Sequence, residues 1–307
     1  MTKPVAAIDC GSNSTRLLIV EHTGATVTRQ MRVTRLSEGV DATGALTPAA
    51  LERTWAVLAE YHDEMVRRGA REGLLAATSA VRDASNAARF LERSHAITGV
   101  ETRVLSGEEE AAFTYAGATA DLGADERPTL VLDIGGGSTE MALRLDDSLV
   151  SYSMQLGCVR VTERALGSGV VGADAERAAR AMIAGELDRA FRAEPVFSTL
   201  NARVRLVGVA GTVATLAQMD AGAERYDRDV VHHRLLSLEV VRRWRAQLAG
   251  EVPEARMAHP GMVRGREDVL HAGLLVLEMV MERLGVVEVI SSENDILDGM
   301  AAALVAR

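Results

Sequence analysis

Two short turns in this chain have nearly the same sequence and could together hold a phosphate chain. The first turn is Asp9-Cys10-Gly11-Ser12-Asn13-Ser14-Thr15, and the second turn is Asp133-Ile134-Gly135-Gly136-Gly137-Ser138-Thr139. Glycines such as those at 136 and 137 let the backbone approach a ligand closely, and successive backbone N–H groups in such a turn bind an anion. Ser12, Ser14 and Ser138 add hydroxyl donors. Each turn lies between two apolar runs, which predicts a strand–turn–strand setting.

The carboxylates Asp9 and Asp133 cannot bind phosphate directly, but they can hold Mg²⁺ or its waters, and the metal then bridges to phosphate oxygens. Glu140 follows the second turn, where it could reach the same metal, although an exposed strand residue is an equally good reading. A single turn of this kind would be read as a tight β-turn and nothing more. Its recurrence at matching places in two matching halves favours a ligand site.

A third glycine turn, Gly208-Val209-Ala210-Gly211-Thr212, lies between a predicted strand and a predicted helix. Free N–H groups at a helix N-terminus favour anions. On its own this turn is explained nearly as well as a plain strand–helix connection. Its interpretation as an anion-binding turn is supported only by the presence of the other two turns.

Two further segments carry charged groups at places suited to catalysis. Ser106-Gly107-Glu108-Glu109-Glu110-Ala111 starts a predicted helix. Acidic residues are favoured there by the helix dipole, but one of the glutamates could instead accept a proton from an attacking water. Arg82 follows the predicted strand 74–78, and ligands gather at the carboxyl ends of strands in open α/β sheets. It could therefore clamp a phosphate, although a surface ion pair with Asp83 is the commoner fate of an arginine.

The predicted elements that position these groups repeat the order βββαβαβα twice, so we expect mixed sheets covered by helices. The polar segment 123–127 is the natural junction, giving domains 1–124 and 125–307, with the last helix a candidate to pack back on the first domain. Residues 221–262 read as an insertion. The strands are expected at 3–10, 14–22, 25–33, 74–78, 102–105, 128–134, 138–145, 148–154, 204–209 and 286–291. The helices are expected at 48–68, 86–97, 108–120, 157–167, 173–192, 213–219, 238–249, 266–284 and 296–306.

Composition excludes several classes of protein. The net charge of −9 argues against a nucleic-acid binder held by a general basic surface. The two cysteines, Cys10 and Cys158, form no disulfide framework, and Cys10 is expected to pack as a small apolar residue. His232-His233 lack a further ligand at zinc spacing, and P-loop and nucleophile-elbow motifs are absent from the sequence. We expect a cytoplasmic, soluble protein without a membrane segment.

The motifs taken together resemble the exopolyphosphatase / guanosine pentaphosphate phosphohydrolase family, in its short two-domain form. The resemblance runs from residue 3 to about residue 300 and rests on the segments 9–18, 77–84, 106–111, 133–140 and 208–212. It implies two actin-like (ribonuclease-H-like) α/β domains of the sugar kinase/Hsp70/actin superfamily, with an active-site cleft between them. It also implies Mg²⁺-dependent hydrolysis of a terminal phosphoanhydride, with Mn²⁺ as an alternative metal and K⁺ as an assisting ion.

The resemblance also assigns roles to individual residues. It implies that Glu110 is the catalytic base, that Asp133 and Glu140 bind metal, that Arg82 binds phosphate, and that Ser12 and Asn13 lie at phosphate. Where the family has Arg-Glu-Gly near the end, this chain has Leu297-Asp298-Gly299, so those roles do not carry over.

The expected substrate is short inorganic polyphosphate, with guanosine pentaphosphate as the alternative. An actin-fold kinase and a non-catalytic alarmone sensor are two rival readings. No acceptor motif supports the kinase, and the set Glu110, Asp133 and Glu140 argues against the sensor. A homodimer is a candidate assembly that the sequence leaves open.

Overall fold

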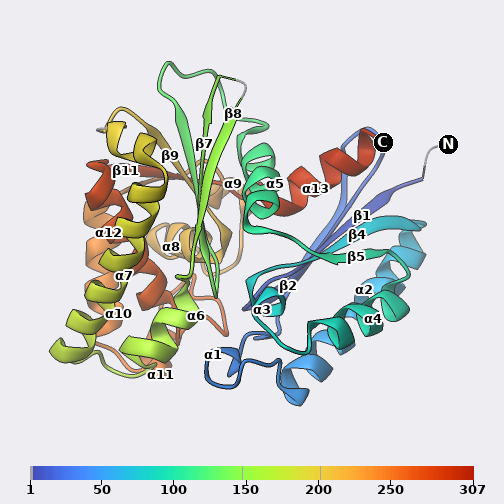
Figure 1. The fold of residues 1–307 in the computed structure, drawn as a ribbon, viewed down its shortest axis with the longest axis horizontal. Coiled ribbons are helices and arrows are strands. Elements are labelled where there is room, and N and C mark those ends of the chain that lie inside the picture. The colour runs from blue at the N-terminus through green and yellow to red at the C-terminus, as the bar shows by residue number, and fades with distance from the viewer. Residues whose placement is uncertain (1–2, 147, 201) are drawn as a thin grey trace. The chain divides into compact units, whose positions relative to one another are not determined.

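The computed structural model describes residues 3–146, 148–200 and 202–307 (Figure 1). Contacts divide the chain into two compact units. Unit 1 comprises residues 1–120 and 295–307, and unit 2 comprises residues 121–294.

Unit 1 is built on a mixed five-stranded sheet with the order β3-β2-β1-β4-β5. The first three strands form an antiparallel meander, whereas β1, β4 and β5 are parallel neighbours. The parallel strands therefore end at one edge of the sheet. The strands are β1 (Val5–Cys10), β2 (Ser14–Val20), β3 (Thr26–Val33), β4 (Glu72–Ala77) and β5 (Glu101–Val104).

Helices cover both faces of this sheet. Apolar residues of α2 and α4 belong to one buried cluster, and those of α13 belong to a second cluster with alternate residues of β1 and β4. The predicted start of α2 is confirmed, because the Thr47 hydroxyl accepts from the Ala50 N–H at 3.3 Å and Pro48 follows the cap. The helices are α1 (Val40–Thr43), α2 (Pro48–Arg68), α3 (Ser79–Arg82), α4 (Ala87–Thr98), α5 (Gly107–Thr119) and α13 (Ile296–Val305).

The last helix, α13, packs in unit 1 beside α5 (Figure 1), which is the alternative that the sequence allowed for it. The boundary between the units follows residue 120, where the sequence predicted residue 124. Two glycines explain the close packing. A Cβ atom on Gly117 would lie 1.9 Å from the Asp295 carbonyl oxygen, and one on Gly299 would lie 1.9 Å from the Phe113 carbonyl oxygen. The two helix backbones therefore approach each other more closely than any larger residue would allow.

Unit 2 has a six-stranded sheet with the order β10-β11-β9-β6-β7-β8. Five of its strands repeat the order and directions of unit 1, so the predicted pair of actin-like α/β folds is confirmed. The sixth, β10, comes from the 221–262 insertion, where no strand was predicted, and it pairs antiparallel with β11. Its three residues are too few to show an alternating pattern. The strands are β6 (Thr129–Ile134), β7 (Thr139–Leu145), β8 (Ser148–Met154), β9 (Arg205–Val209), β10 (Leu235–Ser237) and β11 (Glu288–Ser291).

Apolar residues of the unit 2 helices pack with residues of its strands in one buried cluster. The single helix expected at 157–167 is instead an α-helical turn, α6, followed by a π-helical turn, η1, in which the Gly167 N–H donates to the Thr162 carbonyl. The helix expected from residue 266 begins at Leu270. The helices are α6 (Cys158–Val161), η1 (Thr162–Leu166), α7 (Ala173–Ala193), the 3₁₀ turn η2 (Pro195–Thr199), α8 (Ala210–Asp220), α9 (Arg228–Val231), α10 (Leu238–Ala249), α11 (Pro253–Arg256) and α12 (Leu270–Leu284).

Cys10 is fully buried in the core of unit 1, as expected, and burial raises its thiol pKa well above the ordinary value. Over the described ranges, no helix is both long and apolar enough to cross a membrane.

Candidate active site

The predicted site residues of unit 1 lie at or just after the carboxyl ends of its parallel strands. Cys10 pairs in register with Ala77, and Ala77 pairs with Val104, so β1, β4 and β5 end side by side. The first turn follows β1, α3 follows β4, and α5 follows the end of β5. The fold therefore brings the first turn, Arg82 and Glu110 to one edge of the sheet.

The first turn is held in shape by its own backbone and by the neighbouring segment. The Gly11 N–H donates to the Ser14 carbonyl at 3.0 Å, and the Asn13 carbonyl accepts from the N–H groups of Thr34 and Arg35 at 3.0 and 2.9 Å. The hydroxyl groups of Ser12 and Ser79 lie 2.9 Å apart. The Asn13 side-chain nitrogen is buried without a hydrogen-bond partner among the described residues. It is therefore a donor that a bound phosphate could satisfy.

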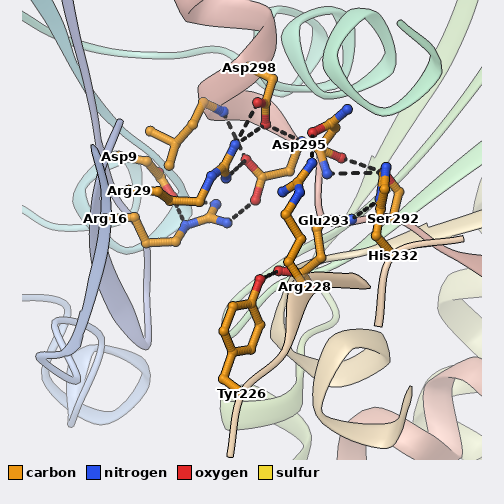
Figure 2. Close-up of polar contacts among 12 residues, drawn as sticks. Asp9, Arg16, Arg29, Tyr226, Arg228, His232, Ser292, Glu293, Asp295 and Asp298 are labelled. Atoms are coloured by element: carbon orange, nitrogen blue, oxygen red, sulfur yellow. Dashed lines mark hydrogen bonds and ion pairs between the residues drawn. The ribbon is translucent and has the colours of Figure 1, made fainter. Parts of the chain in front are cut away.

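Asp9, at the end of β1, is held by Arg16 from the neighbouring strand (Figure 2). Arg16 donates to Asp9 Oδ2 through Nε at 3.0 Å and through Nη2 at 2.6 Å, and its Nη1 reaches Asp295. Burial raises the pKa of the Asp9 carboxyl, and the Arg16 charge opposes this rise. Asp9 Oδ1 is buried without a hydrogen-bond partner in the described part of the chain.

Arg82 and Glu110 lie together as an ion pair. Arg82 Nη1 donates to Glu110 Oε2 at 3.2 Å and to the Leu105 carbonyl at 2.9 Å. Arg82 Nη2 is a buried atom with no hydrogen-bond partner in the described structure. The Ser106 cap fixes α5, because Ser106 and Glu109 form a complete capping box that leaves Glu110 on the buried side. The arrangement holds a carboxylate beside an arginine that keeps one unused donor.

In unit 2 the second turn has the same closure as the first. The Gly135 N–H donates to the Ser138 carbonyl at 3.0 Å. The start of α6 is packed against the turn, since a Cβ atom on Gly157 would lie 2.4 Å from the Gly136 carbonyl oxygen and 2.6 Å from the Gly137 nitrogen. The buried side chain of Arg160 donates through Nε to the Gly137 carbonyl at 2.7 Å. The backbone of the turn is therefore fixed from the side of α6.

Asp133 and Glu140 face each other across this turn. They are register partners in the antiparallel pair β6–β7, and both side chains are buried. Side chains that lie directly opposite on such a pair point to the same face of the sheet. The Ser153 hydroxyl donates to Glu140 Oε1 at 2.6 Å. Two buried carboxylates on one face form an oxygen-donor set suited to a divalent cation.

The third glycine turn lies at the same sheet edge, because Asp133 pairs in register with Val209 in the parallel pair β6–β9. The space above Gly211 is filled, since a Cβ atom there would lie 1.8 Å from the Arg266 guanidinium carbon. Thr212 is buried against α12, where a Cβ atom on Gly273 would lie 2.5 Å from its hydroxyl oxygen. The absence of a side chain at Gly211 therefore leaves room for the Arg266 guanidinium group at this edge of the sheet.

The model of the Ppx/GppA phosphatase family matches residues 18–306. The chain belongs to the Ppx/GppA phosphatase family. The predicted resemblance is thereby confirmed over nearly the whole length.

Named members of the Ppx/GppA family align with nearly all of the chain. Exopolyphosphatase 2 of Mycobacterium tuberculosis (strain ATCC 25618 / H37Rv) is 37% identical, over 98% of both chains. Guanosine-5'-triphosphate,3'-diphosphate pyrophosphatase of Vibrio atlanticus (strain LGP32) is 31% identical over 98% of this chain, which spans 59% of that protein. The crystal structure of an exopolyphosphatase-like protein superposes with a TM-score of 0.92, at 31% identity and 99% coverage of both chains.

Three site residues of this Ppx/GppA family member were not identified from the sequence. Ser79 touches Ser12, Arg160 holds the second turn, and Arg266 covers Gly211. Ser79 stands beside the predicted strand end 74–78 and could have been found there. Arg160 and Arg266 fell inside or at the start of predicted helices, where arginine is common, so no signal marked them.

Proposed function

We propose that this protein is an exopolyphosphatase-type phosphohydrolase that releases the terminal phosphate of short inorganic polyphosphate. The observation that carries the proposal is the pair of Arg82 and Glu110, a buried carboxylate at 3.2 Å from an arginine with an unused donor. In this proposal Glu110 accepts the proton of the attacking water, and Arg82 binds a phosphoryl oxygen through Nη2. Within unit 1, the backbone N–H groups of the first turn bind phosphate oxygens at the same sheet edge.

The carboxylates of unit 2 fit a divalent cation better than Asp9 does. Asp133 has a second carboxylate, Glu140, as its register partner, whereas the register partner of Asp9 is the cationic Arg16. Mg²⁺, which prefers carboxylate oxygens, suits the Asp133–Glu140 pair, with Mn²⁺ as an alternative. When bound, such an ion offsets negative charge on the phosphate oxygens. Ser153 orients Glu140 for this role through its hydroxyl.

Hydrolysis of guanosine pentaphosphate is the second candidate function. It is favoured by the 31% identity to the Vibrio atlanticus guanosine-5'-triphosphate,3'-diphosphate pyrophosphatase. Both substrates end in a terminal phosphoryl group that the same residues would bind. The chemistry assigned to Arg82 and Glu110 is therefore unchanged.

The experiment compares defined-length polyphosphates with guanosine pentaphosphate in Mg²⁺, with no phosphate acceptor present. We expect inorganic phosphate to appear from tripolyphosphate while the chain shortens by single phosphates. Faster release from guanosine pentaphosphate than from any polyphosphate would favour the second candidate. No release from any of these substrates, with tight binding retained, would contradict the proposal and favour a sensor.

A further inference from the structure

We propose that Asp121, His232 and His233 form a second metal site in unit 2, for a borderline divalent cation of the Zn²⁺ class. The sequence argued against a histidine metal site, because His232-His233 lack a further ligand at zinc spacing. The fold supplies it from a distant segment. The ligand atoms of the three side chains all lie within 4.8 Å of one another.

Both imidazole side chains lie close to the carboxylate of Asp121. His232 Nε2 lies 2.8 Å from Asp121 Oδ2, and His233 Nε2 lies 3.4 Å from Asp121 Oδ1. The two imidazole rings are stacked, with centroids 3.8 Å apart. The two nitrogen–oxygen separations are near the distance between neighbouring ligands of a tetrahedral Zn²⁺ ion, whose bonds are about 2.0–2.2 Å long. One ion could therefore replace the His232–Asp121 hydrogen bond and the His233–Asp121 contact with small side-chain movements.

The surrounding groups hold the three side chains in place. The Asn294 side-chain amide donates to Asp121 Oδ2 at 2.8 Å. His233 has a left-handed backbone, with φ 61°, and its N–H donates to the Ser291 carbonyl at 2.7 Å. A residue held in this sparsely populated conformation is constrained by its surroundings. The two imidazoles thus stand side by side because the backbone between them is fixed.

The ligand types of this site differ from those of the Asp133–Glu140 pair, so the two sites favour different metals. Two imidazoles and one carboxylate suit Zn²⁺ and its neighbours among the transition metals, whereas Mg²⁺ prefers oxygen ligands alone. Asp121 and His233 are exposed. An ion bound there keeps its remaining positions open to water.

Metal binding has a structural consequence at Glu293. The Glu293 N–H donates to His232 Nδ1 at 3.1 Å (Figure 2), so the His232 proton lies on Nε2 in the metal-free protein. An ion at Nε2 moves that proton to Nδ1, and the Glu293 N–H then loses its acceptor. Metal binding at His232 therefore breaks a hydrogen bond of the backbone at Glu293.

Calorimetric titration of the full chain with ZnCl₂ tests the assignment. We expect one Zn²⁺ per chain, and at least about tenfold weaker binding in His232→Asn/His233→Asn and in Asp121→Asn. His22→Asn, which changes an exposed histidine elsewhere, is the matched control and should bind as the wild type does. Circular dichroism of each variant verifies folding.

Two results would overturn the assignment. One is the absence of Zn²⁺ binding by the wild type, or equal binding by the double variant. The other is hydrogen exchange at the Glu293 amide that does not change on adding Zn²⁺, because an ion on His232 Nε2 must accelerate it. Neither readout depends on phosphate release, so the outcome is separate from that of the proposed function.

Discussion

Asp133 and Glu140 lie directly opposite each other on β6 and β7, at the register position that Asp9 and Arg16 occupy on β1 and β2. The repeated motif therefore yields a closed ion pair in unit 1 and two carboxylates in unit 2. This difference is why we assign phosphate contact to the first turn and metal binding to the second.

Removing one of the two carboxylates should weaken metal binding. We expect Glu140→Gln to raise the Mg²⁺ concentration needed for half-maximal phosphate release by at least about tenfold, because a neutral amide is a poorer ligand than a carboxylate. Mn²⁺ binding followed by electron paramagnetic resonance should weaken in parallel. Glu288→Gln, on an exposed position of β11, is the control and should change neither value. Unchanged Mn²⁺ binding in Glu140→Gln would remove Glu140 from the metal site.

Arg82 should act as a bidentate group. Arg82→Ala removes both the contact to Glu110 and the unused Nη2, and we expect kcat/KM to fall about 10²–10³-fold. Arg82→Lys keeps the charge but loses the fork, so its activity should lie between those of the wild type and the alanine variant. Arg93→Ala, on α4 of the same unit, serves as the control. Equal activity of the lysine and alanine variants would show that only the guanidinium fork matters, and wild-type activity in both would contradict the assignment.

The close contact between α5 and α13 should depend on glycine. Gly299→Ala places a Cβ atom 1.9 Å from the Phe113 carbonyl oxygen, so we expect the free energy of unfolding to fall by about 1–3 kcal/mol. Gly185→Ala is a matched control in α7, where the added Cβ would meet nothing within 4 Å beyond its chain neighbours and the helix's own backbone. Its helix should gain about 0.5–1 kcal/mol. Urea unfolding measures both variants, and equal stability of the two would contradict the packing argument.

The buried His271 imidazole should lower the free energy of unfolding in mild acid. Burial, together with the nearby Arg256 charge, lowers the pKa of His271 to about 4 from an ordinary value of 6.5. Between these values the unfolded state binds a proton that the folded state does not, so stability falls as pH drops from about 6.5 towards 4. The loss is on the order of 2–3 kcal/mol. His271→Gln should flatten this part of the urea-unfolding profile, and an unchanged slope in that variant would assign the effect to other groups.

The sequence predicted the elements that repeat, and it missed those that depend on contacts between distant segments. The two βββ meanders and the amphipathic helix α2 carry periodic patterns and defined caps, so their positions were predicted correctly. The return of the last helix to the first domain was a candidate, but its contact with α5 was not predicted, because it depends on Gly117 and Gly299, which meet only in the folded unit. The three residues of β10 are likewise defined by their partner β11.

The same distinction holds for the candidate site. Asp133, Glu140, Arg82 and Glu110 stand in motifs or at strand ends, so their types and positions were readable. Arg266 lies against Gly211 because α12 folds back onto α8, and Asp121 lies 111 positions from His232. No local spacing rule brings such residues together.

The most direct test of the central claim is the rate of phosphate release from tripolyphosphate in Mg²⁺ by the Glu110→Gln variant. Gln keeps the shape of the side chain and can still accept from Arg82, but it cannot take a proton from water. The account predicts a fall in kcat of about 10²–10⁴-fold with the fold intact. Turnover close to that of the wild type would contradict the assignment of Glu110 as the base.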